Sequence, residues 1–375
     1  MKHKTLLVNY VYWQNVGHII EALRYALGYH IANPSLEISL AVNKHTPYFL
    51  ANLFPWIKQT YIIDLPDKNV KVTENLYKHI PKEWDYVASD GRSRTREWCP
   101  GAFYDYYQQV NEYLNVRGKS GYCGDSFIPY KPNQQLKLEL PEENLTFAKK
   151  HIIGTKIKIG VLFAGAKDPE FFPSIRSWET IFDAFYKQYP NLSLYFFGKL
   201  KRTDRSTLST FERKDLDILL KKYPHSVNCF DMDLLNQLAI VRQLDLFFSP
   251  HTGFGFAVVC VGTPWLTLSG GRWREYFFNG IPFYSVLPDP KKYPCYENPN
   301  YDKTTKDEGT RILSMSRQRI LEDMPEILKG ADILINKKWD CEKCLRSYFD
   351  KLVKFLGEDT SKIWSFDNFH KNYIK

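Results

Sequence analysis

The sequence contains two consecutive series of short apolar strands and amphipathic helices, and this repeated alternation limits the folds open to it. The first series has expected strands at residues 5–11, 36–42, 60–65 and 85–89 and expected helices at 18–29 and 101–115. The second has expected strands at 156–163, 192–197, 244–249 and 265–268 and expected helices at 177–188, 234–242 and 255–261. Alternating strands and helices form parallel sheets covered by helices. We therefore predict an α/β protein with two Rossmann-like domains.

The segment between the two series predicts where one domain ends and the next begins. Residues 117–141 are rich in glycine and proline and look like a loop, and a helix is expected to follow to about residue 151. We predict domains over residues 1–153 and 154–375. A chain of 375 residues is long enough for each domain to bury its own core.

Composition and charge exclude several classes of protein. The 25 Tyr, 25 Phe and 9 Trp are too many for a disordered chain. The net charge of +9 suits a small anionic ligand, but the basic residues are scattered and form no nucleic-acid motif. Apolar runs such as 254–261 are far shorter than the ~20 residues that span a bilayer. The first residues read as a strand and not as a signal peptide, so we expect a soluble, cytoplasmic protein.

Two short motifs could indicate a metal, and neither is convincing. Cys341 and Cys344 have the spacing of half a zinc or redox site, but the sequence has no second pair to complete it. Asp231 and Asp233 have the spacing of a metal-binding pair, but Asp233 precedes a helix and is expected to cap it. We therefore expect no metal and no other cofactor.

The most informative segment joins the apolar strand at 244–249 to the helix that follows it. The strand brings His251 and Thr252 to its carboxyl end, and Gly253, Phe254 and Gly255 begin the helix. Free backbone N–H groups and the dipole of a helix N-terminus favour a phosphate at such a place. The alternative is a tight turn whose glycines serve only packing. Taken alone, the motif leaves both interpretations open.

This segment resembles a known family. Thr252-Gly253, a helix of small residues and then Gly262-Thr263-Pro264 look like the C-terminal domain of GT-B glycosyltransferases. They are most similar to the heptosyltransferase-like group, glycosyltransferase family 9, although His251 stands where that group has Asp. The resemblance implies two Rossmann-like domains facing a central cleft, with the acceptor on the first and the nucleotide sugar on the second. It also implies that the last helices can pack back on the first domain.

Four basic residues are candidates for binding the donor diphosphate. The family has a basic residue that contacts the pyrophosphate in a place comparable to Lys167 or Arg176, and Lys199 at the next strand end competes for this role. Arg272 follows two glycines at another strand end and suits a phosphate or a sugar. The alternative for each of them is solvated surface charge.

The first domain carries the candidates for acid–base chemistry. Gly17-His18, after the first strand, resembles the Gly-His of several GT-B enzymes, which implies that Gly17 lies at the donor and that His18 is catalytic. An imidazole is a suitable general base near neutral pH. Glu21, one turn further on, and Asp90, after the strand at 85–89, are competing bases.

Together these features predict a metal-independent glycosyltransferase. It would move a sugar from a nucleotide-diphosphate donor to a glycan or other hydroxyl acceptor, as in the synthesis of cell-envelope polysaccharide. Helix N–H groups and cationic side chains would stabilise the leaving diphosphate in place of a divalent metal. Two alternatives use the same scaffold: a sugar-nucleotide epimerase or hydrolase, and a non-catalytic two-lobed sugar-binding protein.

Overall fold

The computed structural model describes residues 4–11, 14–65, 77–90, 109–114, 118–154, 157–165, 172–201, 209, 211–270, 274–293 and 315–374. The chain forms two compact units, Met1–Leu138 with Thr203–Ser206 and Glu139–Arg202 with Thr207–Lys375. The boundary between the units thus lies before helix α4 (Glu142–His151). The sequence pattern placed it after this helix, at residue 153. Helix α4 packs on helix α7 (Leu234–Val241), and Asn144 Nδ2 donates to Asn236 Oδ1 at 2.8 Å, so α4 belongs to the second unit.

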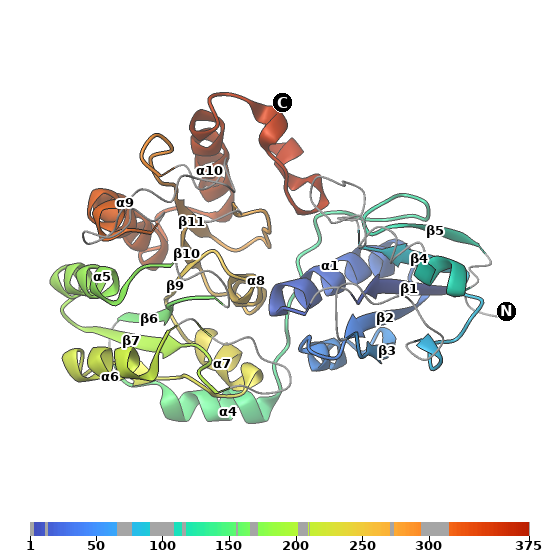
Figure 1. Cartoon of the computed structure of the whole chain (residues 1–375), viewed down its shortest axis with the longest axis horizontal. Coiled ribbons are helices and arrows are strands. Elements are labelled where there is room, and N and C mark those ends of the chain that lie inside the picture. Colours follow the sequence, from blue (N-terminus) through green and yellow to red (C-terminus); the bar gives the residue numbers. More distant parts are fainter. Residues whose placement is uncertain are drawn as a thin grey trace. The chain divides into compact units, whose positions relative to one another are not determined.

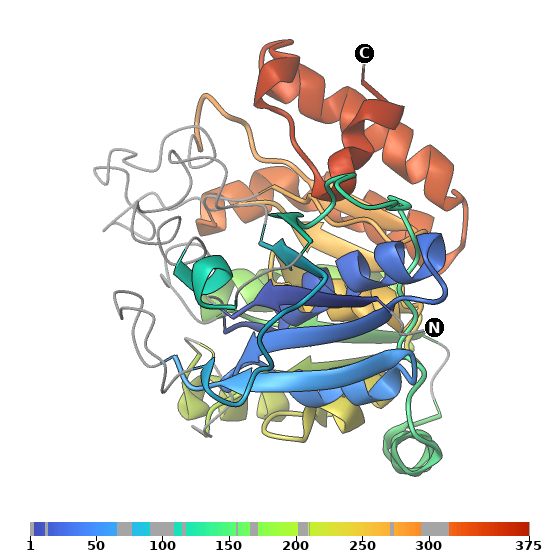
Figure 2. The ribbon, with the colours of Figure 1, turned by 90° about the vertical axis from the view of Figure 1, so that its right-hand side faces the viewer.

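The first unit is built on a parallel sheet of five strands in the order β3-β2-β1-β4-β5. The strands are β1 (Thr5–Tyr10), β2 (Glu37–Asn43), β3 (Ile57–Ile63), β4 (Tyr86–Ser89) and β5 (Lys119–Tyr122). Helix α1 (Val16–Ala32) follows β1, and a 3-10 helix, η1 (Tyr48–Leu53), follows β2. Figure 2 shows β1, β2 and β3 side by side. Strands β2 and β3 lie on one side of β1, and β4 and β5 lie on the other side, so the strand order reverses between β1 and β4.

Strand β5 corrects one expectation, because it lies inside the glycine-rich segment predicted to be a loop. It pairs with β4 in parallel, with Gly121 opposite Ala88. A Cβ on Gly121 would lie 2.4 Å from the Phe127 ring, so the glycine allows the strand to pack closely against that ring. A strand that contains glycine for this reason lacks the β-branched residues by which strands are predicted.

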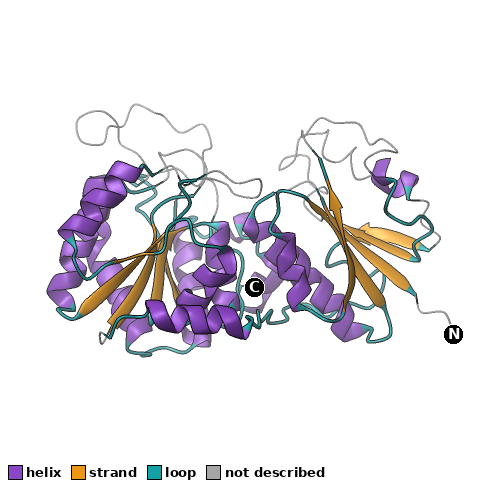
Figure 3. Ribbon diagram, turned by 90° about the horizontal axis from the view of Figure 1, so that it is seen from below, coloured by secondary structure: helices purple, strands orange, loops and turns teal. Residues whose placement is uncertain are grey.

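The second unit has a six-stranded parallel sheet in the order β11-β10-β9-β6-β7-β8. Its strands are β6 (Ile157–Leu162), β7 (Leu192–Phe197), β8 (Val227–Asn228), β9 (Leu246–Pro250), β10 (Trp265–Leu268) and β11 (Phe283–Val286). Counted within the unit, this is the 3-2-1-4-5-6 strand order of dinucleotide-binding domains. Figure 3 shows both sheets flanked by helices. The predicted α/β class with two Rossmann-like units is confirmed.

The described part of the second unit also contains the helices that Figure 1 labels α5 to α10. They are α5 (Ile175–Gln188), α6 (Arg213–Lys222), α7, α8 (Gly253–Cys260), α9 (Arg317–Ile335) and α10 (Cys341–Phe355). The apolar side of α5 packs into the core as predicted, since Trp178, Phe182 and Phe185 are fully buried. Helices α9 and α10 pack on β11, within the second unit. In the part of the chain that the structure describes, no helix is long and apolar enough to cross a membrane.

Candidate functional site

The strand order of the second unit reverses between β6 and β9, and their carboxyl ends lie together. A Cβ on Gly165, just after β6, would lie 3.6 Å from Thr252 Cγ2, just after β9. Parallel α/β sheets bind ligands at this kind of point, outside the carboxyl ends of the two strands where the order reverses. The predicted segment around Thr252 therefore lies where the fold favours a ligand.

Unused hydrogen-bond donors collect at the N-terminus of α8. Thr252 occupies the N-cap position but its side chain caps nothing, and its Oγ1 is buried without a hydrogen-bond partner. Within the described ranges, the backbone N–H groups of Gly253 and Phe254 have no acceptor either. A buried hydroxyl beside free amides at the positive end of a helix dipole is an arrangement that binds an anion.

Packing explains the side-chain requirement at two of the residues predicted to bind the donor. The amide of Gly255 donates to the carbonyl of Thr252 at 3.0 Å, and a Cβ on Gly255 would lie 2.2 Å from the Trp265 ring. Gly255 thus supplies no free amide, and it is a glycine because Trp265 leaves no space for a side chain. The ring of Phe254 packs beside the rings of Phe247 and Phe197, so only its backbone faces the candidate site.

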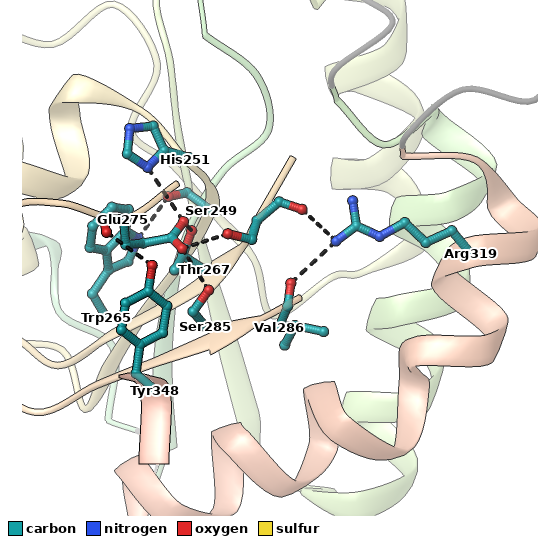
Figure 4. Close-up of polar contacts among 10 residues, drawn as sticks. Ser249, His251, Trp265, Thr267, Glu275, Ser285, Val286, Arg319 and Tyr348 are labelled. Carbon is teal, nitrogen blue, oxygen red and sulfur yellow. Dashed lines mark hydrogen bonds and ion pairs between the residues drawn. The ribbon is translucent and has the colours of Figure 1, made fainter. Parts of the chain in front are cut away.

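His251, directly before Thr252, is held by a buried carboxylate (Figure 4). Its Nδ1 lies 3.4 Å from Glu275 Oε1, and the Glu275 side chain is completely buried. The same carboxylate accepts hydrogen bonds from three hydroxyls: Ser269 at 2.5 Å, Ser285 at 2.6 Å and Thr267 at 3.2 Å. Tyr348 donates to the backbone carbonyl of Glu275 at 2.9 Å.

These contacts fix the ionisation state of Glu275. Burial opposes ionisation, but the hydrogen bonds from His251, Ser269 and Ser285 and the charge on His251 outweigh it, and the pKa of Glu275 lies below its usual value. Facing a carboxylate, Nδ1 of His251 carries a hydrogen, which fixes the tautomer and the ring. His251, one residue before the free hydroxyl of Thr252, is thereby held in one orientation.

Sequence reasoning missed Glu275. Nothing in the sequence separates it from other acidic residues. Its partners come from the ends of three strands, because His251 follows β9, Thr267 and Ser269 lie on and after β10, and Ser285 lies on β11. These partners lie close together only because β9, β10 and β11 are neighbours in the sheet.

The structure describes two of the four basic residues that were predicted to bind the donor. Lys199 follows β7, beside β6, and its Nζ donates to the carbonyl of Asp231 at 3.3 Å. Arg176 lies in the first turn of α5 and is exposed. Lys167 and Arg272 lie outside the described residues. The structure therefore places two of the four, and neither is shown at the Thr252 hydroxyl.

The two motifs considered for metal binding have local structural roles. Asp231 Oδ1 accepts hydrogen bonds from the amides of Leu200 and Lys201, at 2.8 and 2.9 Å. Asp233 is the N-cap residue of α7, as predicted, but its side chain makes no capping bond. Burial raises the pKa of Cys341 to about 12 and that of Cys344 to about 11, so both thiols keep their protons at neutral pH and are poor nucleophiles.

The first unit brings two of the competing bases together. His18 lies in the first turn of α1, and its Nδ1 is 3.2 Å from Glu21 Oε2. The hydroxyl of Tyr10 donates to the same Glu21 oxygen at 3.0 Å. The Glu21 side chain is 3% exposed and that of His18 is 15% exposed, so the imidazole is the accessible member. A carboxylate on Nδ1 leaves Nε2 of His18 as the proton acceptor.

The other candidates of the first unit are more buried. Asp90 follows β4 and its amide donates to the carbonyl of Asn9 at 3.2 Å, with 1% of the residue exposed. Gly17 is buried in the first turn of α1, next to His18. Of the three candidate bases, His18 has the geometry of a proton acceptor held by a second group.

The comparisons with known proteins bear on the fold. No protein-family model matches the sequence, and no curated protein is significantly similar to it. Among solved structures, a glycosyl transferase of family 9 from Veillonella parvula is 14% identical, with a TM-score of 0.59 over 90% of this chain and 98% of that one. The chain has the GT-B fold.

Two heptosyltransferases from E. coli share this GT-B fold. WaaC, solved with ADP, is 9% identical, with a TM-score of 0.53 over 88% of this chain and 99% of that one. ADP-heptose lps heptosyltransferase II is 11% identical, with a TM-score of 0.50 over 88% of this chain and 99% of that one. The predicted resemblance to the heptosyltransferase-like group is confirmed at the level of fold.

Proposed function

We propose that this GT-B protein is a glycosyltransferase that takes a sugar from a nucleotide-diphosphate donor and moves it to a hydroxyl acceptor. One observation carries the proposal. The buried, unpaired hydroxyl of Thr252 adjoins the free amides of Gly253 and Phe254, at the point where the strand order of the second sheet reverses. This set of donors suits the diphosphate of such a donor. The similarity in fold to WaaC, whose structure holds ADP, supports it.

We assign proton removal to His18 and stabilisation of the leaving group to the N-terminus of α8. His18, with Nδ1 held by Glu21, takes the proton of the acceptor hydroxyl as it attacks the anomeric carbon. The bond from that carbon to the diphosphate breaks, and the Thr252 hydroxyl and the amides of α8 stabilise the negative charge on the leaving group. His251, oriented by Glu275, adds a further donor when it is protonated. We propose that the reaction needs no divalent metal and takes place in the cytoplasm, on a cell-envelope glycan.

A thermal-shift screen against ADP, GDP, UDP, CMP and dTDP tests this proposal. A ligand present at about a hundred times its Kd adds about 2.7 kcal/mol to the free energy of unfolding, which raises Tm by several degrees. We expect at least one of the four nucleoside diphosphates to do so, and CMP, which has a single phosphate, to have a much smaller effect. No shift with any diphosphate would contradict the proposal.

The alternatives give different products with the nucleotide sugar identified in this way. A glycosyltransferase needs an acceptor for full turnover, whereas an epimerase or hydrolase changes the donor alone. A non-catalytic sugar-binding protein turns over nothing with any acceptor.

A further inference from the structure

Asn9, close to the carboxyl end of β1, is a buried polar residue whose hydrogen bonds are not made. It is 0% exposed, and neither Nδ2 nor Oδ1 of its carboxamide has a hydrogen-bond partner within the described ranges. Buried side-chain polar atoms nearly always have partners, since an unpaired group loses its hydration and gains nothing in return. The carboxamide of Asn9 thus has a donor and an acceptor that the described residues do not use.

The position of Asn9 in the sheet agrees with this. Its register partners are Ala41 on β2 and Ser89 on β4, and the strand order of the first unit reverses between β1 and β4. This is the ligand position of a parallel α/β sheet. Leu7, two residues earlier on the same face, belongs to an apolar cluster that also contains Val87. The face thus changes from apolar to polar at its carboxyl end, where Asn9 and Ser89 succeed Leu7 and Val87.

A neighbouring asparagine shows what a structural carboxamide looks like at this edge. Asn43, at the end of β2, is also 0% exposed. Its Nδ2 donates to the carbonyl of Leu65 at 3.4 Å, and its Oδ1 accepts from the amide of His45 at 3.0 Å. Among the described residues, each end of the Asn43 carboxamide therefore has a partner and neither end of the Asn9 carboxamide has one, although the two lie on adjacent strands.

We propose that the carboxamide of Asn9 binds a hydroxyl group of a neutral carbohydrate, the acceptor of the transfer, and this inference rests on the proposed function. A carboxamide donates through Nδ2 and accepts through Oδ1, which matches a hydroxyl that does both. Among the described residues, Ser89 is the register partner of Asn9 and its hydroxyl donates to Asn111 Oδ1 at 3.5 Å, and Asp90 follows it. Both side chains can hydrogen-bond a sugar hydroxyl.

The substitution Asn9→Leu, with Asn43→Leu as its matched control, tests this in the full-length protein. The probes are the methyl glycosides of glucose, galactose, mannose and N-acetylglucosamine, and the readout is the shift in Tm. We expect at least one glycoside to raise the Tm of the wild type and to leave that of Asn9→Leu unchanged. Asn9→Leu should itself melt no lower than the wild type, because a shape-matched apolar group replaces two unpaired atoms. Asn43→Leu should melt lower and keep the sugar-dependent shift.

Three results would overturn the inference: no glycoside stabilises the wild type, Asn9→Leu keeps the full shift, or Asn9→Leu melts clearly below the wild type. If Asn9→Leu does not fold, Asn9→Asp replaces it, with the same shape but no amide donor, and the same loss of the sugar-dependent shift is expected. The nucleoside diphosphates should stabilise the Asn9 variants as they do the wild type. If a variant loses the sugar-dependent shift and keeps the nucleotide-dependent shift, the result concerns the role of Asn9. If the wild type shows no nucleotide-dependent shift, the result contradicts the proposed function.

Discussion

The substitution His18→Ala is expected to lower turnover by about 10²–10⁴-fold, the usual contribution of a general base, and to leave the affinity for nucleoside diphosphates unchanged. The expectation follows from the contacts of the imidazole. Glu21 Oε2 lies 3.2 Å from Nδ1 and also accepts from the hydroxyl of Tyr10, so the imidazole is oriented to accept a proton at Nε2. His18 lies in the first unit, and the diphosphate donors lie in the second.

The measurement is the rate of donor consumption with an acceptor, together with calorimetry of nucleoside diphosphate binding. His225→Ala is the control, because His225 is an exposed histidine of the second unit outside both candidate sites. Glu21→Gln should fall between the wild type and His18→Ala, since it keeps the imidazole and loses its ionised partner. A wild-type rate in His18→Ala would show that another group is the base, with Asp90 the remaining candidate.

Glu275→Ala is expected to lower the free energy of unfolding by roughly 3–5 kcal/mol, because several buried groups lose their hydrogen-bond acceptor and each such loss costs about 1–3 kcal/mol. The carboxylate accepts from three hydroxyls and faces His251, and all four groups would be left buried without it. For a unit of this size the loss corresponds to a drop in Tm on the order of 10 °C. Calorimetric unfolding measures it.

Two companion variants separate the charge of Glu275 from its shape. Glu143→Ala, on the exposed side of α4, should stay within about 0.5 kcal/mol of the wild type. Glu275→Gln keeps the shape and loses the charge, so it should be intermediate. Because the folded-state pKa of Glu275 lies below its unfolded value, the stability that its charge contributes is complete above the ordinary carboxyl pKa. That contribution is lost as pH falls through the folded-state pKa.

The wild type and Glu275→Gln should therefore differ most near neutral pH and converge in acid. A difference that does not depend on pH would show that Glu275 acts through shape alone. A loss of less than about 1 kcal/mol in Glu275→Ala, smaller than the cost of one unpaired buried group, would contradict the account of this cluster.

The elements of the fold could be predicted where the pattern of apolar side chains and the residues on either side mark a strand or helix. The strand at 265–268 was predicted with its observed bounds, because Pro264 precedes it and Ser269-Gly270 follows it. Strand β5 could not be predicted, because it contains Gly121, whose lack of a side chain leaves space for the Phe127 ring. Strands β8 and β11 were also missed, because segments of two and four residues show too little of the strand alternation to be recognised, and helix α6 was not predicted either.

The candidate site divides in the same way. Thr252 and His18 follow strands directly, so local spacing was enough to propose them. Glu275 and Asn9 depend on which strands lie side by side, and no local pattern encodes that order. The packing of Gly255 against Trp265 could not be predicted, because a glycine that approaches a ligand and a glycine that faces a ring look alike in a sequence.

The most direct test of the central claim, that the N-terminus of α8 binds a diphosphate, is calorimetry of the stabilising nucleoside diphosphate with the wild type and with Thr252→Val. Valine has the shape of threonine without the hydroxyl, and Thr252 Oγ1 has no hydrogen-bond partner among the described residues. We expect Thr252→Val to be at least as stable as the wild type and to bind about tenfold or more weakly, because a hydrogen bond to a charged group contributes about 1.5–3 kcal/mol. Equal affinity in the two proteins would contradict the claim.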